Sequence, residues 1–218
     1  SVRVRSTDSG GLTTDKVFTI SVSDINETPT NIAISANSIA ENAGSNAGVG
    51  SFTTTDPDAG DSFGYSLVSG TGDDNNDQFV VSGDQLQAKS GFNFEAKSSY
   101  SVRVRSTDSG GLTTDKVFTI SVEDLNEVPT DITISSDTIA ENSSTNTLIG
   151  TFSSIDPDTT GSFTYAFAIG TGDIDNDSFV ISGNQLLTNA VFDFEAKSSY
   201  SIRVMSTDEG DLSTEKIL

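Results

Sequence analysis

The sequence contains no cysteine, no histidine and no tryptophan. Without cysteine there are no disulfides, and without cysteine and histidine there are no metal sites built from thiolate or imidazole ligands. The absence of histidine also removes the usual general base at neutral pH. Hard cations bound by oxygen ligands are the metal sites that this composition still allows.

Basic residues are scarce as well, because 11 Lys and Arg stand against 32 Asp and Glu, which gives a formal net charge of -21. A chain this acidic repels itself unless cations neutralise it, and nucleic acid is excluded as a partner. The sequence has neither an apolar run of about 18 residues nor a basic segment that leads into an apolar one. It therefore predicts no membrane span and no signal peptide, and we expect the chain to be a window on a longer protein.

The sequence repeats itself with a period of 100 residues. Residues 1–22 are identical to residues 101–122, and residues 31–118 match residues 131–218 at 46 of 88 positions without a gap. Because the unit keeps its length as well as its pattern, the chain is predicted to be a tandem array.

The pattern restarts after Pro29 and again after Pro129. We therefore predict the last strands of a preceding repeat plus a linker at 1–30, a complete repeat at 31–130, and a second repeat, truncated in its last strand, at 131–218. Two strands with one apolar face are marginal in water on their own. Residues 1–30 are therefore expected to pair with another chain or with other parts of the parent protein.

Apolar and polar residues alternate over short runs, which predicts strands with one buried face. In the first complete unit these runs are 49–56, 63–70, 78–83, 100–108 and 116–124. Gly, Asp, Asn and Ser fill the gaps, as is typical of tight turns. About seven short strands in about 100 residues predict an all-β fold of tandem Greek-key β-sandwiches of the immunoglobulin-like kind, stacked end to end.

Acidic residues recur near the ends of the predicted strands, where a sandwich presents its loops. They lie in the motifs AEN, FNFE or FDFE, DINE or DLNE, DPD and STD, which return in the same order after 100 residues. Together these motifs resemble the cadherin repeat over nearly the whole chain. The resemblance is greatest to the cadherin-like repeats of large bacterial surface and secreted proteins.

The resemblance implies calcium ions at the junctions between repeats. At the middle junction the matching motifs give the implied ligands Glu41, Asn93, Glu95, Asn126, Glu127, Asp156, Asp158 and Asp208, with the backbone carbonyls of Leu125 and Val128. Partial sets are Asn26, Glu27, Asp56, Asp58 and Asp108 at the first junction, and Glu141, Asp193 and Glu195 at the last. The six carboxylates of the middle set would balance three divalent cations, and calcium accepts irregular oxygen shells.

Some positions depart from the family pattern or fall outside it. Asn93 stands where the family usually has Asp, and Glu127 replaces an Asp with a longer side chain. Asp24 and Asp124, which open the linker motifs, are expected to shape the loop rather than to bind. The loop at 72–77 has the alternating acids of half an EF-hand but lacks its glycine and its final glutamate, so an Asx-rich turn is expected there and in its copy.

The leading functional hypothesis is a calcium-stiffened extender segment of an extracellular bacterial protein that acts in cell adhesion. Its expected partners are calcium, neighbouring repeats, and surface proteins or polysaccharide. The alternative is a carbohydrate-binding module of a secreted polysaccharide-degrading system. Sugar platforms usually need exposed aromatic rings, whereas Tyr65, Tyr100, Tyr165 and Tyr200 fall on alternating strand positions that predict core packing. An enzyme is not expected, because a glycosidase needs two carboxylates in a cleft and a tandem sandwich with acids at its poles offers none.

Overall fold

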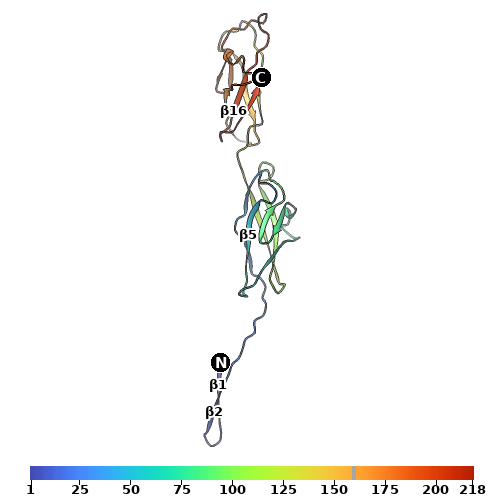
Figure 1. The fold of residues 1–218 in the computed structure, drawn as a ribbon, viewed down its shortest axis with the longest axis vertical. Coiled ribbons are helices and arrows are strands. Elements are labelled where there is room, and N and C mark those ends of the chain that lie inside the picture. Colours follow the sequence, from blue (N-terminus) through green and yellow to red (C-terminus); the bar gives the residue numbers. More distant parts are fainter. Residues whose placement is uncertain (159–160) are drawn as a thin grey trace. The chain divides into compact units, whose positions relative to one another are not determined.

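The structure is a computed structural model that describes residues 1–158 and 161–218 (Figure 1). Within these residues almost all regular structure is strand, with two short 3₁₀ turns, η1 (Asn76–Gln78) and η2 (Asn176–Ser178). The strands are β1 (Val2–Thr7), β2 (Thr13–Phe18), β3 (Asn31–Ile34), β4 (Ser38–Ala40), β5 (Gly48–Thr55), β6 (Gly64–Leu67), β7 (Phe79–Ser82), β8 (Gln85–Ala88), β9 (Ser99–Thr107), β10 (Thr113–Glu123), β11 (Asp131–Ile134), β12 (Leu148–Ile155), β13 (Thr164–Phe167), β14 (Phe179–Ser182), β15 (Gln185–Thr188), β16 (Arg203–Thr207) and β17 (Ser213–Ile217).

The chain divides into two compact units. The first consists of Ser1–Asn37, Gly44–Ser90 and Tyr100–Ile120, and the second of Ser38–Ala43, Gly91–Ser99 and Ser121–Leu218. The second unit thus contains the AEN and FNFE motifs of the first repeat together with the linker and the whole second repeat. The repeat boundaries given by the sequence, 31–130 and 131–218, stay a prediction.

The N-terminal hairpin of β1 and β2 pairs antiparallel, with Val2 opposite Phe18. Arg5 donates two hydrogen bonds to the carboxylate of Asp15 across the hairpin. Asp15 is half-buried, and all remaining residues of β1 and β2 are exposed. No third strand of the described chain pairs with them. The hairpin therefore buries no apolar core of its own.

The first repeat has two four-stranded sheets, in the orders β3-β5-β8-β7 and β4-β10-β9-β6. Each of the five predicted alternating runs overlaps one of these strands, so those predictions are confirmed. Apolar residues of both sheets are buried, as the pattern of alternation requires: Ile32, Phe52, Phe79 and Leu86 from one sheet, and Val102, Val104 and Ile120 from the other. The all-β sandwich prediction is confirmed as well.

The second repeat has the sheets β11-β12-β15-β14 and β13-β16-β17. Its core is one cluster to which both sheets contribute, with Phe152 and Phe179 from the first sheet and Val204 from the second. Residues 138–140 form no strand, whereas β4 at the matching position of the first repeat pairs in parallel with the end of β10. The second repeat therefore has one strand fewer than the first within the described residues.

Hydroxyl groups join the two sheets inside each repeat. Thr54 contacts the Tyr65 hydroxyl at 2.9 Å and the buried Ser106 hydroxyl at 2.7 Å, and the same trio recurs 100 residues later with Ser154 in place of Thr54. The Tyr65 ring also packs on Phe52, with the ring centroids 5.2 Å apart. The predicted core role of the tyrosines is therefore confirmed at these two positions.

Candidate metal centre

Glu41 is a buried acid at the end of the first repeat. It directly follows β4 and is only 1% exposed. Its two carboxylate oxygens each accept a backbone hydrogen bond of 2.9 Å, one from the N–H of Phe94 and one from the N–H of Leu125. These contacts fix the carboxylate in one orientation beside the linker.

Four carboxylates converge around Glu41. One oxygen each of Glu41, Glu95, Asp124 and Asp158 lies within 4.8 Å of all the others. Two of these acids come from the first repeat, one from the linker and one from the loop that follows β12. Like charges this close repel one another, and a bound cation or protons would offset this repulsion.

Asp158 of this cluster and its neighbours Asp156 and Glu127 each have one hydrogen-bonded carboxylate oxygen and one without a partner among the described residues. One oxygen of Asp158 accepts the N–H of Glu127 at 2.7 Å. One oxygen of Asp156 accepts the N–H of Asp158 at 3.0 Å. One oxygen of Glu127 accepts a hydrogen bond from the side-chain amide of Asn42 at 2.7 Å. The other oxygen of each is buried and has no hydrogen-bond partner in the described chain.

Such oxygens destabilise the folded state, because burying a carboxylate oxygen without a partner costs on the order of several kcal/mol of folding free energy. A hard divalent cation removes this cost, since oxygen atoms are the ligands that calcium takes. The donor set of the cluster therefore fits calcium.

Asn126 and Asp208, two further predicted ligands, lie against each other. The Asn126 amide donates to one oxygen of Asp208 at 3.0 Å, and the other oxygen of Asp208 accepts the backbone N–H groups of Gly210 and Leu212. A side chain at position 210 would come within 2.5 Å of the Asn126 side chain, so this approach requires glycine.

The side chain of Asn93 makes hydrogen bonds to Glu95 and to the backbone of Ala96. Its amide nitrogen donates to Glu95 at 3.1 Å, and its side-chain oxygen accepts the N–H of Ala96 at 2.6 Å. Asn93 therefore orients Glu95, and a direct ligand role for Asn93 stays a prediction. The side chains of Leu125 and Val128 are exposed and apolar, so only their main-chain carbonyls can serve as predicted.

The same arrangement recurs at the first linker. Asn26 donates to Asp108 at 3.1 Å, and the N–H of Glu27 donates to Asp58 at 2.8 Å. The acids there form two groups, Asp24 with Glu27 and Asp58, and Asp56 with Asp61 and Asp108. Buried oxygens of Asp56 and Asp61 again have no hydrogen-bond partner in the described chain.

A fourth group joins the exposed side chains of Glu141, Asp193 and Glu195. The N–H of Phe194 donates to Glu141 at 3.1 Å, as the N–H of Phe94 does to Glu41. This group matches the Glu41 side of the middle cluster.

Three residues of these groups were not predicted as ligands from the sequence. Asp24 and Asp124 were expected to shape the loop, yet their carboxylates lie inside the acidic groups. Asp61 was not singled out at all, because residue 161 is glycine and the repeat gives no signal at that position.

Burial and neighbouring charges shift the pKa values of the acids in the middle cluster. Burial raises the pKa of Asp156, against a lowering hydrogen bond from the Asp158 backbone. Burial also raises the pKa of Asp124, with the charges of Asp158 and Glu41 adding to it. A backbone hydrogen bond lowers the pKa of Glu95, but burial and neighbouring charges raise it more. Each shift means that the ionised form is disfavoured here unless a cation is present.

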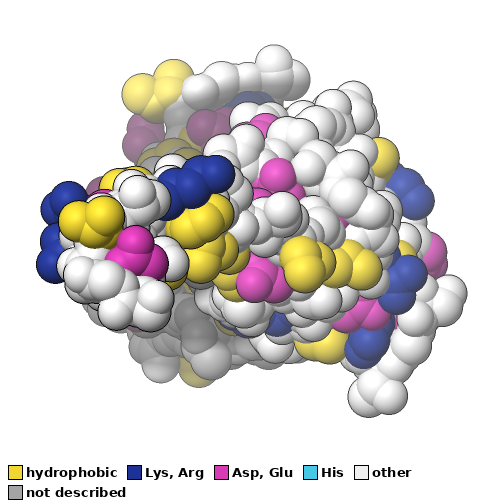
Figure 2. Space-filling model, turned by 90° about the horizontal axis from the view of Figure 1, so that it is seen from below, with side chains coloured by type: hydrophobic (Ala, Val, Ile, Leu, Met, Phe, Trp, Pro, Cys, Tyr) yellow, Lys and Arg dark blue, Asp and Glu magenta, His cyan; other side chains and the backbone are white. Residues whose placement is uncertain are grey.

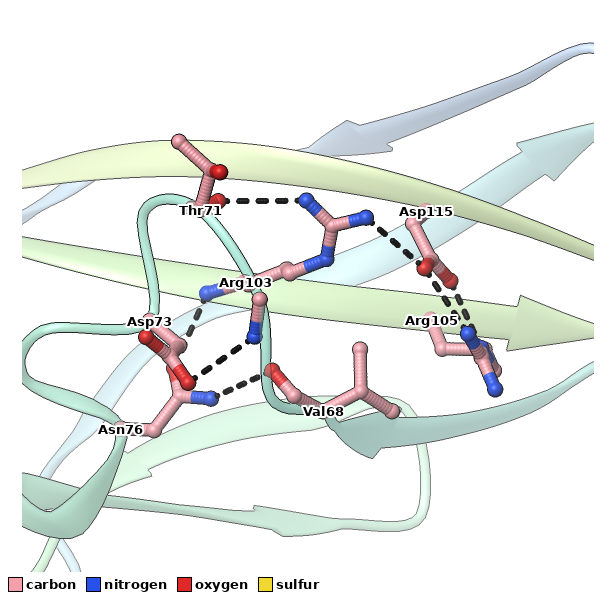
Figure 3. Close-up of polar contacts among 8 residues, drawn as sticks. Val68, Thr71, Asp73, Asn76, Arg103, Arg105 and Asp115 are labelled. Atoms are coloured by element: carbon pink, nitrogen blue, oxygen red, sulfur yellow. Dashed lines mark hydrogen bonds and ion pairs between the residues drawn. The ribbon is translucent and has the colours of Figure 1, made fainter.

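The acidic loop at 72–77 is built differently, because its polar side chains hold the loop itself (Figure 3). Asp73 accepts the N–H of Gly70 at 3.0 Å, and Asn76 bonds both the carbonyl of Val68 and the N–H of Arg103. None of the acidic groups found in the described chain includes this loop. These contacts are those of the expected Asx-rich turn.

Comparison with known proteins gives one family of relatives. No protein-family model matches the chain. Human cadherin-24 is 29% identical over 224 residues, which cover 92% of this chain and 27% of that protein. The chain thus spans about a quarter of the length of this curated relative.

Solved structures agree in fold. Protocadherin gamma B7 extracellular cadherin domains 3–6, solved as a cis-dimer, give a TM-score of 0.61 at 23% identity and cover 88% of this chain and 47% of that one. The protocadherin gamma B4 extracellular domain gives a TM-score of 0.59 at 22% identity, covering 99% and 41%. At these identities the likeness establishes the fold.

The described residues contain no helix with the length and apolarity needed to cross a membrane. In sequence and in fold, over nearly its whole length, the chain resembles the cadherin-repeat family.

Proposed function

We propose that the chain is a calcium-binding structural segment of an extracellular adhesive protein. Calcium binds at the middle cluster, where acids of the first repeat, the linker and the loop after β12 meet. The ions hold the two repeats, 31–130 and 131–218, in a fixed relation and convert a hinge into a stiff joint. The bacterial surface origin that the motifs suggest is part of this proposal, and so is the absence of catalytic activity.

The observation that carries the proposal is the set of buried carboxylate oxygens without partners on Glu127, Asp156 and Asp158. Ordinary surface acids leave their oxygens in water. These oxygens are withdrawn from water while the second oxygen of each group is fixed by a hydrogen bond. Such an arrangement supports a preformed cation site better than it supports a solubilising surface.

Calcium suits the cluster better than magnesium. The donors come from separate loops and are irregular in number and direction, which calcium tolerates, whereas magnesium demands a near-ideal octahedron and retains its waters. Binding of the ion to the folded chain alone also stabilises that state by mass action.

Calorimetric titration of Asp158→Asn with calcium tests the site. The substitution keeps the shape of the side chain but removes a charge that joins the cluster to the Glu127 backbone, so we expect calcium affinity at the middle junction to fall by about tenfold or more. Asp77→Asn, which neutralises an exposed acid of the 72–77 loop, is the matched control and should bind as the natural chain does. Equal affinity in the Asp158→Asn variant, or no calcium binding by the natural chain, would contradict the proposal.

Carbohydrate binding has no comparable support. Tyr65 and Tyr165 are half-buried and bonded to core hydroxyls, and Tyr200 packs on Phe192 with ring centroids 4.5 Å apart. The tyrosines therefore do not offer the exposed row of rings that this alternative requires.

A further inference from the structure

Asn42 lies in the turn that directly follows β4 and Glu41. Its φ angle is 56°, in the left-handed region of the backbone, which asparagine adopts more readily than most other residues do. Its main-chain N–H donates to the carbonyl of Phe92 at 2.9 Å. The main chain of the turn is thus one reason for an asparagine at this position.

The side chain of Asn42 makes a further contact, which the turn does not require. Its amide nitrogen donates to Oε1 of Glu127 at 2.7 Å, across 85 positions of the sequence. The main-chain N–H of Glu127 donates to Asp158 at 2.7 Å. Glu127 is therefore held at its side chain by the turn after β4 and at its main chain by the loop after β12.

The hydrogen bond from Asn42 leaves the second carboxylate oxygen of Glu127 for another ligand. This oxygen, Oε2, is buried and has no hydrogen-bond partner among the residues that the structure describes. Acidic side chains on the outer surface have water around their oxygens, and the face drawn in Figure 2 shows such side chains in several places. A carboxylate that is fixed by one oxygen and withdrawn from water at the other is suited to bind a hard cation.

The contact depends on the length of the side chain at position 127. An aspartate there would be shorter by about one carbon–carbon bond, roughly 1.5 Å. With its main chain still bonded to Asp158, its carboxylate would lie beyond the range of a hydrogen bond from Asn42. The amide of Asn42 and the longer side chain of Glu127 are therefore matched to each other.

Asn142, the copy of Asn42 in the second repeat, separates the turn from the amide contact. Its φ angle is 58°, and its main-chain N–H donates to the carbonyl of Phe192 at 2.9 Å. The two turns are therefore alike in their main chains. A change that acts through the turn should have the same effect at both positions.

We propose that Asn42 is a positioning residue of the middle calcium site, which holds Oε1 of Glu127 so that Oε2 is left for the ion. The inference rests on the proposed calcium site and adds to it a neutral residue that lies outside the acidic groups. Loss of the amide removes no charge from the cluster. Its effect on calcium affinity comes from a carboxylate that is no longer fixed, and partners of this kind typically contribute about tenfold to a hundredfold to metal affinity.

Calorimetric titration of Asn42→Gly with calcium tests the proposal. Glycine adopts the left-handed turn without strain and removes the amide, so the affinity of the sites that Asp158→Asn weakens should fall by about tenfold. Asn142→Gly makes the same change in the matching turn, and its affinity at the middle junction should equal that of the natural chain. Far-ultraviolet circular dichroism in chelator should be the same for both variants, since neither removes a core side chain.

A second variant, Glu127→Ala, distinguishes positioning of the carboxylate from any other effect of Asn42. Without the glutamate side chain the amide has nothing to hold, so adding Asn42→Gly to Glu127→Ala should lower the calcium affinity no further. Full additivity of the two losses would overturn the positioning role, because Asn42 would then act otherwise than through Glu127.

The outcome for the calcium site itself is read separately. If Asp158→Asn binds calcium weakly while Asn42→Gly binds it as the natural chain does, the positioning role is wrong and the calcium site stands. If the natural chain binds no calcium, the proposed function fails and this inference fails with it.

Discussion

At the scale of single residues, Asp115 shows how two arginines stabilise one half-buried carboxylate (Figure 3). Arg105 donates to both of its oxygens, at 2.7 and 2.9 Å, and Arg103 donates at 3.1 Å. The hydrogen bond from Arg105, together with Arg103 and against the effect of burial, lowers the pKa of Asp115 from 3.8 to about 2. The folded state therefore binds the proton of Asp115 less readily than the unfolded state does.

This difference predicts a loss of stability in acid. Because the folded pKa is the lower one, the contribution of Asp115 is complete above the unfolded value of 3.8 and is lost as the pH falls toward about 2. Its size is on the order of 1 kcal/mol, after allowance for the partial exposure of the two arginines. Urea unfolding at a series of pH values measures it as the difference between the natural chain and Asp115→Asn.

The difference between these two chains should shrink across that interval, because protonation makes the two side chains alike. The acids of the metal cluster have raised pKa values and act in the opposite direction, but they are common to both chains and cancel. Asp74→Asn, at an exposed loop position, should show no such trend. A difference that stays constant with pH would refute the assignment.

At the scale of elements, β5 depends on a close approach of the chain to itself. A Cβ on Gly50 would lie 2.8 Å from the main-chain nitrogen of Ala36, where the register of β5 against β8 shifts. Main-chain atoms cannot move away as cheaply as the end of a flexible side chain can, so any side chain at this position strains the chain.

Gly50→Ala should therefore destabilise the first repeat by about 2 kcal/mol or more, by the cost of overpacking a well-packed element. Gly48→Ala is the control in the same strand, since a Cβ there meets no atom within 4 Å. Thermal unfolding followed by circular dichroism is the measurement. Equal melting temperatures for the two variants would show that the main chain around Gly50 shifts enough to accommodate a Cβ, and would contradict the prediction.

The elements are also the level at which the sequence was most informative. Alternation predicted the strands because each has one buried face, as β9 shows, and the period of 100 residues predicted the second copy. Motif order grouped Glu41, Glu95 and Asp158 at one junction, and their carboxylates do lie together. Asp124 was expected only to shape the loop, because its approach to the other acids depends on how the linker and a distant loop converge.

At the scale of the whole molecule, the proposed role of calcium is mechanical. Removing the ion leaves the cores of the repeats intact, because the buried apolar clusters contain none of the clustered acids. It exposes the mutual repulsion of Glu41, Glu95, Asp124 and Asp158. The chain should therefore stay folded while the relation between its repeats becomes variable.

Small-angle scattering of the chain with calcium and with a chelator measures this change. With calcium we expect one well-defined maximum dimension and a higher melting temperature, because only the folded chain holds the ion site together. With chelator the distance distribution should broaden while the far-ultraviolet circular dichroism stays the same, and magnesium should restore little of the difference. If scattering and melting temperature are the same in both conditions, the acidic clusters do not act as a calcium joint and the chain is a plain acidic spacer.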